Sequence, residues 1–240
     1  MQVLLVNGSP HQHGCTFTAL DEVRKTLEEE GIGTQMYWVG TKPIAGCIDC
    51  RKCGTLKRCV FNDKVNEFLG MAASFDGFFF GTPVHWAASD GFLTSFLSRA
   101  FFVCQNGGLD TFYLKPAAGV VSARRAGTTS TWDQINKYFG ILEMPIVTSQ
   151  YWNQVHGRTP DEVRQDIEGM QTMRTLARNM AYLLRCKEAA KKAGVPPAEA
   201  RARHSHGLHP LTSTGQAGSR FTALKAGEIS LEGPSQKTLG

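Results

Sequence analysis

The stretch Val3-Leu4-Leu5-Val6-Asn7-Gly8-Ser9-Pro10 decides the fold, because four apolar residues run directly into four turn-forming ones. The apolar run predicts a short strand that enters a loop at once. Apolar residues then recur at helical spacing, with Leu20, Val23 and Leu27 on one face, and the helix is expected to end near Gly31. A strand, a loop and a helix in this order form the first unit of an alternating chain.

The same alternation of strand and helix continues along the chain. Further strands are expected at residues 34–39, 77–80, 116–122 and 144–149. Helices are expected at residues 62–72, after a cap at Ser89, at residues 129–140, and from Thr159 to near Gly194. Five alternations predict an α/β fold in which a five-stranded parallel sheet lies between two layers of helices. We therefore expect a three-layer, flavodoxin-like domain over residues 1–194.

The composition fits one domain followed by a tail of a different kind. The chain has 240 residues, of which 42% are hydrophobic, and this suffices for a sizeable core. Residues 195–240 are rich in Pro, Ser, Thr and Gly, which predicts a C-terminal tail that is disordered or embraces a second subunit. Its three histidines, His204, His206 and His209, lie near no cysteine or carboxylate cluster and are expected to be solvated.

Charge and cysteine usage narrow the classes of function. The net charge is +5 and no basic patch is interleaved with aromatic residues, which argues against nucleic-acid binding. No apolar run approaches the roughly 20 residues that span a bilayer, and the first residues do not resemble a secretion signal. Seven cysteines, an odd number, fit a reducing compartment better than a disulfide framework. These features predict a cytoplasmic protein without a membrane partner.

In an open α/β sheet, ligands bind beyond the carboxyl ends of the strands, where three loops of this chain are expected to meet. The first loop leads into a helix N-terminus, whose free N–H groups and dipole favour a phosphate. It contains neither Gly-x-Gly-x-x-Gly nor Gly-Lys-Ser/Thr, so one phosphate is expected rather than a pyrophosphate. Ser and Thr at a helix start also serve as ordinary caps. The candidate binding residues of this loop are Ser9, His11, Gly14, Cys15, Thr16, Phe17 and Thr18.

The second and third loops suit a planar heterocycle. The second has a kinked backbone and two aromatic rings, although a turn with a half-buried tryptophan is the simpler interpretation of the loop alone. Its candidate residues are Thr82, Pro83, Val84, His85 and Trp86. The third has amides and two guanidinium groups, which either stabilise a reduced, anionic ring or pair with surface carboxylates. Its candidate residues are Ser122, Arg124, Arg125 and Gly127.

Between the second strand and the second helix, four cysteines lie within thirteen residues: Cys47, Cys50, Cys53 and Cys59. The two-residue spacers let a loop turn successive thiolates toward one point, and the neighbouring Lys and Arg residues offset negative charge. Iron–sulfur clusters and structural zinc both use such compact ligand sets. Four free thiols are the third interpretation. The isolated Cys104 and Cys186 are expected to be buried on helices.

Taken in order, these motifs resemble those of the iron–sulfur flavoprotein branch of the NADPH-dependent FMN reductase family. That family's Gly-Ser-Pro-Arg-x-x-Gly-Asn-Thr corresponds to residues 8–16, its Gly-x-Pro-Val-Tyr loop to residues 81–85, and its Arg-Arg-x-Gly element to residues 124–127. The family's cysteine loop is matched by the four clustered cysteines, and the resemblance covers residues 1 to about 190. This chain has His11, Cys15 and His85 where the family has Arg, Asn and Tyr, so side-chain contacts to a phosphate differ while a planar ring is kept.

The resemblance implies a flavodoxin-like fold with FMN as the cofactor, and it adds weight to a four-iron cluster on the cysteines. We expect an FMN-dependent oxidoreductase that takes electrons from NAD(P)H or a ferredoxin-type donor and passes them to an acceptor, without a side-chain acid or base. The alternative is an electron-transfer carrier without a small-molecule substrate, and a zinc-bearing interaction module is a third hypothesis. Exposed-looking aromatic residues predict a homo-oligomer, namely Phe102, Phe112, Tyr113 and Phe221.

Overall fold

The computed structural model describes residues 1–198, and the predictions made for His204, His206, His209 and Phe221 lie outside them. Five parallel strands form the sheet: β1 (Gln2–Asn7), β2 (Gly33–Trp38), β3 (Gly77–His85), β5 (Ala117–Ala123) and β6 (Gln154–His156). Their order is β2-β1-β3-β5-β6, and the short β4 (Ala88–Ser89) pairs antiparallel with the end of β3. The strand order reverses between β1 and β3, which confirms the predicted flavodoxin-like topology.

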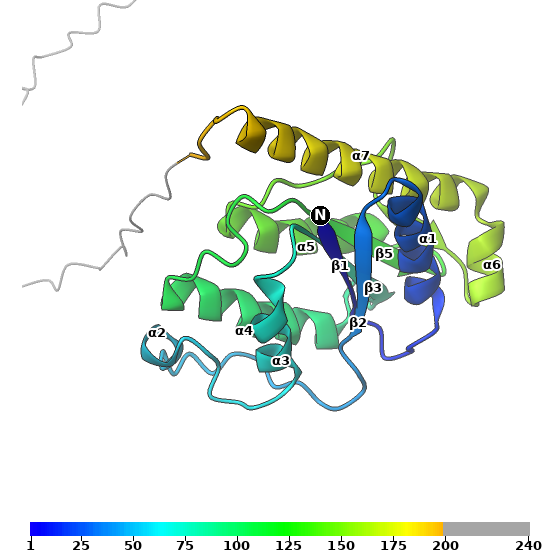
Figure 1. The fold of residues 1–240 in the computed structure, drawn as a ribbon. Helices are drawn as coiled ribbons and strands as arrows, with labels where there is room; N and C mark the ends of the chain where they lie inside the picture. Colours follow the sequence, from blue (N-terminus) through cyan, green and yellow to red (C-terminus); the bar gives the residue numbers. More distant parts are fainter. Residues whose placement is uncertain (199–240) are drawn as a thin grey trace, which may run out of the picture. The chain divides into compact units, whose positions relative to one another are not determined.

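Helices cover both faces of the sheet, which gives the predicted three layers (Figure 1). They are α1 (Cys15–Glu29), α2 (Cys53–Leu56), α3 (Lys64–Ala72), α4 (Gly91–Gly107), α5 (Thr128–Ile141), α6 (Pro160–Gln165) and α7 (Ile167–Lys192). Successive residues of a strand point to opposite faces. Leu4 and Val6 of β1 therefore pack with α3, α4 and α5, whereas Val3 and Leu5 pack with α1 and α7.

The central strand β3 shows why the sheet is buried on both faces. Phe78, Phe79 and Phe80 have no exposed surface, and Phe79 packs toward α1 and α7 while its two neighbours pack toward α3, α4 and α5. This continuous apolar run is typical of a strand covered by helices on both sides. Truncating one of these rings to Ala would cost about 3–5 kcal/mol of stability through lost burial and a cavity.

The fifth strand forms later in the chain than residues 144–149, so that prediction was wrong in its position. The Ala117 N–H donates to the Pro145 carbonyl at 2.9 Å and the Val147 N–H donates to the Ala117 carbonyl at 2.8 Å, and the chain then leaves the sheet. Pro145 has no N–H, so the pairing cannot extend to the N-terminal side of Ile146, and an isolated bridge between Ala117 and Ile146 forms instead of a strand. The buried Asn153 closes the excursion by donating to the Val147 carbonyl at 3.3 Å, and β6 resumes the pairing.

Two helix boundaries also differ from the prediction. Asp90, not Ser89, caps α4, because its carboxylate accepts the Phe92 N–H at 2.7 Å. The single helix expected after Thr159 is broken at Asp166 into α6 and α7. Asp166 accepts the Gly169 N–H at 2.9 Å and the His156 N–H at 2.6 Å. The same carboxylate thus caps α7 and holds the end of β6. The predicted cap at Thr159 is confirmed.

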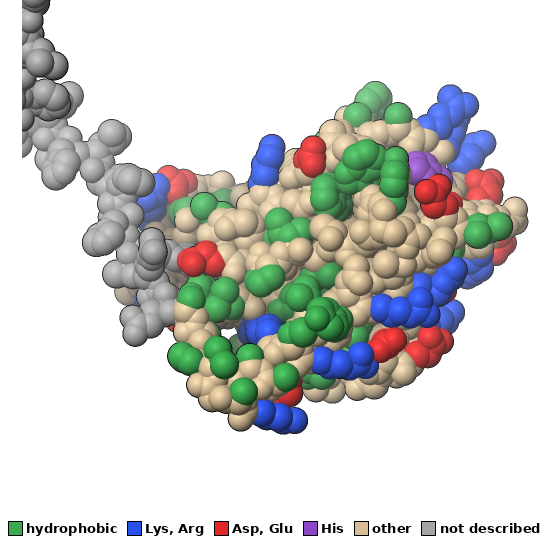
Figure 2. Space-filling view, turned by 90° about the horizontal axis from the view of Figure 1, so that it is seen from above, with side chains coloured by type: hydrophobic (Ala, Val, Ile, Leu, Met, Phe, Trp, Pro, Cys, Tyr) green, Lys and Arg blue, Asp and Glu red, His purple; other side chains and the backbone are tan. Residues whose placement is uncertain are grey.

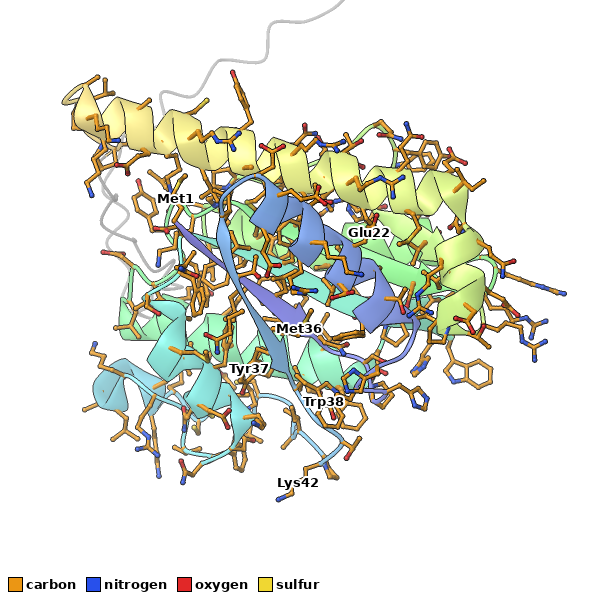
Figure 3. The ribbon with its side chains drawn as sticks, turned by 45° about the vertical axis from the view of Figure 1, so that its right-hand side comes forward. Met1, Glu22, Met36, Tyr37, Trp38 and Lys42 are labelled. Carbon is orange, nitrogen blue, oxygen red and sulfur yellow. The ribbon has the colours of Figure 1, made fainter. Side chains whose placement is uncertain are left out.

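Ion pairs join α7 to α1 on the outer surface of the first helical layer. Arg174 pairs with Glu22, which lies on α1 below α7 (Figure 3), and Arg185 pairs with Glu30 at 2.8 Å. Figure 2 shows basic, acidic and hydrophobic side chains intermingled on the face seen from above. Within residues 1–198, no helix is both long and apolar enough to cross a membrane.

Candidate functional site

The three predicted loops come together at the carboxyl ends of β1, β3 and β5. The Gly8 N–H donates to the Gly81 carbonyl at 2.9 Å, which joins the first loop to the second. The hydroxyls of Thr16 and Ser122 lie 2.8 Å apart, which joins the first loop to the third. We call residues 8–18, 81–89 and 122–128 the three-loop edge. The switch point of a doubly wound sheet is where such folds bind ligands.

The first loop is organised by Asn7, a residue that sequence reasoning missed. Its side-chain oxygen accepts the Ser9 N–H at 3.0 Å and its amide donates to the Gln12 carbonyl at 3.0 Å. The Ser9 hydroxyl in turn accepts the His11 N–H at 3.1 Å. An Asn directly after a strand commonly forms such local bonds, so this signal was available in the sequence.

Gly14 is the N-cap residue of α1 and has no side chain with which to cap the helix. The N–H groups of Cys15, Thr16 and Phe17 form its first turn, where backbone donors and the helix dipole favour an anion. Burial raises the pKa of the Cys15 thiol, whose sulfur lies 3.6 Å from the Gly157 carbonyl oxygen. A neutral thiol leaves this helix start free of negative charge.

The hydroxyls of Thr16 and Thr18 point into the protein rather than toward an open site. Both residues are buried, Thr16 against Ser122 and Thr18 with its hydroxyl donating to the Gly14 carbonyl at 3.1 Å. The Phe17 ring meets the His13 ring edge-on at a centroid distance of 4.8 Å. Backbone amides are therefore the main donors that this loop offers to a ligand.

The second loop is a tight hairpin between β3 and β4 that presents Trp86 outward. Trp86 and Ala87 have φ angles of 53° and 58°, as a two-residue type I′ turn requires, and the indole is fully exposed. The Ser130 hydroxyl donates to the Ala87 carbonyl at 2.7 Å and holds the turn against α5. His85 Nδ1 lies 3.1 Å from the buried Asp90 Oδ2 but without hydrogen-bond geometry.

The third loop packs against that hairpin and exposes two cations. Gly127 has a φ of 99°, and a Cβ on it would lie 2.8 Å from Cα of Ala87, so only glycine fits this close approach. Arg124 and Arg125 are exposed, and within residues 1–198 neither pairs with a carboxylate. The predicted alternative, in which they serve surface ion pairs, is not observed in the described part of the chain.

All four clustered cysteines line one small cavity of about 20 Å³ between the loop and α4, which we call the cysteine cavity. Cys47 and Cys50 are exposed, Cys59 is half-buried and Cys53 is buried. Cys53 Sγ accepts from Asn106 Nδ2 at 3.2 Å. Two nitrogens of the Arg99 guanidinium lie 3.2 and 3.3 Å from Cys59 Sγ, and sequence reasoning missed both of these partners.

Four cysteine thiols are ligands that both structural zinc and a four-iron cluster use. Residues 1–198 contain no group of three or more His, Cys, Asp or Glu side chains placed to hold a metal ion. The donor set suits either group by chemistry, and the N–H donors to two of the sulfurs suit ligands that carry negative charge. The cluster itself stays a prediction.

The cysteine cavity lies well away from the three-loop edge within one chain. Helix α4 begins at Gly91, just after the second loop, and Arg99 of the cysteine cavity lies eight residues further along it. This spacing corresponds to about 12 Å along the helix axis. A separate groove of about 750 Å³ lies over α3 beside the cysteine loop, and Lys42, Lys57 and Arg58 line it. Lys42 lies past the carboxyl end of β2 (Figure 3), where the Trp38 indole donates to the Ser9 carbonyl at 2.9 Å. The uncapped amides and the guanidinium groups of Arg124 and Arg125 gather at the three-loop edge rather than at this groove.

Two expectations outside these sites were wrong. Phe112 is buried and Tyr113 is half-buried, because residues 109–113 fold back onto the core beside α4. Phe102 is half-buried on α4, where it lines the cysteine cavity. Cys104 is buried as expected, but Cys186 lies on the exposed side of α7. Aromatic residues in the segment after a helix were thus packing residues rather than an exposed patch.

Known proteins resemble this chain in sequence and fold. Residues 1–158 match the family described as NADPH-dependent FMN reductase. An iron–sulfur flavoprotein of Methanocaldococcus jannaschii is 28% identical over 197 residues, which cover 77% of this chain and 98% of that protein. An iron–sulfur flavoprotein of Clostridioides difficile is 26% identical over 129 residues, which cover 52% of this chain and 56% of that protein. These relatives confirm the resemblance noted from the motifs.

Solved structures share the fold. RosB with a bound intermediate, 8-demethyl-8-formylriboflavin-5'-phosphate, has a TM-score of 0.59 at 16% identity and covers 97% of this chain and 99% of its own. A flavone reductase also has a TM-score of 0.59, at 14% identity over 79% of this chain and 65% of its own. Because the family match spans more than half of the sequence and includes all four motifs, the chain belongs to the NADPH-dependent FMN reductase family.

Proposed function

We propose that this protein is an FMN-dependent oxidoreductase that takes electrons from NAD(P)H or a protein donor and passes them to an acceptor through a four-iron cluster. The observation that carries the proposal is the cysteine cavity, which gathers all four clustered thiols in a chain of the FMN reductase family. Zinc is the weaker alternative, because the relatives that this chain matches are named iron–sulfur flavoproteins.

The three-loop edge would hold FMN. The first-turn amides of α1 would bind its phosphate, as helix N-termini do, and the neutral Cys15 thiol adds no repulsion. The hairpin from Thr82 to Trp86 would border the ring, with Gly127 allowing the third loop to close against it. When bound, FMN accepts a hydride or single electrons.

The exposed arginines of the third loop would tune this site. Arg124 and Arg125 lack carboxylate partners within residues 1–198, so their charge is available to an anion. A cation near the flavin stabilises its reduced, anionic form and raises its reduction potential. The protein's residues thus bind, orient and polarise the cofactor, and no side chain is assigned a proton transfer.

Anaerobic reconstitution of the full chain tests the proposal. We expect about four iron and four sulfide per chain, together with flavin absorbance near ~450 nm. Cys53→Ala should lose the iron, whereas Cys186→Ala, which removes an exposed thiol on α7, should keep it. Equal iron in both variants, or none in the wild type, would show that these thiols are not cluster ligands.

A second candidate is an electron carrier that serves protein partners only. The observation that favours it is the set of exposed cations beside the cysteine cavity, Lys52, Lys57 and Arg58, which would attract an acidic protein. Steady-state oxidation of NADPH or NADH with a quinone or dye acceptor separates the two. Turnover supports the oxidoreductase, and its absence with intact cofactors supports the carrier.

The cellular setting and assembly state are part of the proposal. The odd number of cysteines, seven in all, supports a reducing, cytoplasmic location rather than a disulfide framework. The protein would form a homo-oligomer through exposed aromatic residues, because Trp86, Tyr151 and Trp152 are exposed. Light scattering that gives the mass of one chain at micromolar concentrations would contradict this assembly.

A further inference from the structure

Arg99 is a buried cation that makes more hydrogen bonds than the one ion pair needed to balance its charge. Its side chain, on the middle of α4, is 1% exposed. Nη1 lies 2.6 Å from Asp63 Oδ2 and Nη2 lies 2.9 Å from Asp63 Oδ1, which is the two-pronged geometry of a strong Arg–carboxylate pair. One carboxylate therefore balances the guanidinium charge in full.

The guanidinium also contacts Cys59, through Nε and through Nη2, which is shared with Asp63. Nε and Nη2 lie 3.3 and 3.2 Å from the Cys59 sulfur, within the range of hydrogen bonds to sulfur. Further N–H contacts reach the carbonyls of Ala45 and Phe61, both at 3.4 Å, and the cation lies 4.8 Å from the centre of the Phe61 ring. The cysteine loop thus wraps around this single side chain.

Holding the loop in place does not require the contacts to sulfur. The backbone of Cys59 is already fixed by Asn66, which accepts its N–H at 2.9 Å and donates to its carbonyl at 2.9 Å. The same amide donates to the Phe61 carbonyl at 2.8 Å. Two guanidinium donors aimed at the thiol therefore act on the sulfur itself.

We propose that Arg99 is a positioning residue that directs the Cys59 sulfur into the cysteine cavity and raises the reduction potential of the cluster bound there. This inference rests on the proposed function. Hydrogen bonds to ligand sulfurs and local charge set the potentials of iron–sulfur clusters. A cation with two donors to one sulfur stabilises the more negative, reduced state. Asp63 orients the guanidinium for this task.

The test compares cluster potentials in the reconstituted full chain. Arg99→Lys keeps the positive charge but loses the guanidinium group with its several N–H donors. We expect the one-electron equilibrium between the oxidised and reduced cluster to shift at least tenfold toward the oxidised state, which lowers the reduction potential by about 59 mV. The double variant Arg99→Met/Asp63→Asn, which removes the carboxylate together with its partner, should shift it further. Arg164→Lys is the matched control, because Arg164 lies on α6, outside the cysteine cavity, and pairs with Asp161 at the surface. An unchanged potential in Arg99→Lys, or an equal shift in Arg164→Lys, would overturn the inference.

A measurement on metal-free, reduced protein separates this inference from the proposed function. The unfolding midpoints would be measured for Arg99→Lys, for Cys59→Ala and for the variant that combines these two substitutions. The shift in the combined variant should differ from the sum of the two single shifts, because the two side chains are in contact. Additive effects would overturn the inference. Coupled effects in a protein that takes up no iron would overturn the proposed cluster instead and leave the contact supported.

Discussion

The three-loop edge and the cysteine cavity use different means to hold reactive groups. At the edge, strand ends fix the loops, and the donors are backbone amides that no rotamer change can move. At the cavity, thiols lie on a loop with only one short helix, where the Asn66 side chain fixes the Cys59 backbone and Arg99 contacts the Cys59 sulfur. The comparison indicates that the edge is set by the fold, whereas the cavity depends on a few polar contacts.

The largest effect should follow from a charge placed at the start of α1. Cys15→Asp would stabilise the helix through its dipole but repel a phosphate at the same amides, so we expect FMN affinity to fall about 100-fold. Cys15→Asn is the matched neutral control and should bind FMN as tightly as the wild type. Flavin fluorescence titrations of the two variants would measure this, and equal affinities would place the phosphate elsewhere.

The contact between the second and third loops gives the next effect. Gly127→Ala puts a Cβ 2.8 Å from Cα of Ala87 at a φ of 99°, and we expect stability to fall by about 1–3 kcal/mol and FMN binding to weaken. The control is Gly140→Ala in α5, where a Cβ meets nothing within 4 Å and Ala stabilises a helix by up to about 1 kcal/mol. Urea unfolding measures both, and a neutral Gly127→Ala would mean that the loops are not fixed by this contact.

A smaller effect is expected at the cysteine loop. Asn66→Ala removes the acceptor and donor that hold the Cys59 backbone, and we expect a loss of about 1–2 kcal/mol. Asn62→Ala serves as the control, since its one bond to Arg58 is exposed and 3.3 Å long. If both variants unfold at the same urea concentration as the wild type, the loop is not held by Asn66.

The smallest effect concerns alkaline pH. Burial raises the pKa of the Cys15 thiol, so the folded state binds this proton more tightly than the unfolded state, whose thiol titrates near about 8.5. The contribution is complete below that pH and declines above it, because the unfolded thiol ionises first. Between about pH 8 and about pH 10, the wild type should lose stability faster than Cys15→Asn. Tyr37 and Tyr138, whose pKa values burial also raises, contribute alike to both proteins. Parallel stability curves would contradict the prediction.

The alternation of strands and helices predicted the sheet order, and the positions of the strand ends predicted the loops that meet at its edge. The alternation missed the displaced fifth strand, since Pro145 and Asn153 act through ladder bonds that appear only once Ala117 is paired. It also missed the break at Asp166, where one carboxylate caps a helix and holds a strand ten residues earlier.

The sequence predicted which segments form the candidate sites, but it did not predict which side chains contact one another there. Sequence spacing indicated that the four cysteines would converge, and they line one cavity. Spacing has no information on Arg99, which comes from a helix forty residues after Cys59 in the sequence and reaches it only through tertiary packing. The inward direction of the Thr16 and Thr18 hydroxyls likewise depends on Ser122 and Gly14 as partners.

The central claim is that one chain has two separate cofactor sites, and counting both cofactors in the same samples tests it most directly. Flavin and iron per chain would be measured in anaerobically reconstituted wild type, Cys15→Asp and Cys53→Ala. The wild type should contain both, Cys15→Asp should retain iron and lose flavin, and Cys53→Ala should retain flavin and lose iron. Loss of both cofactors in either folded variant, or of neither, would contradict two independent sites.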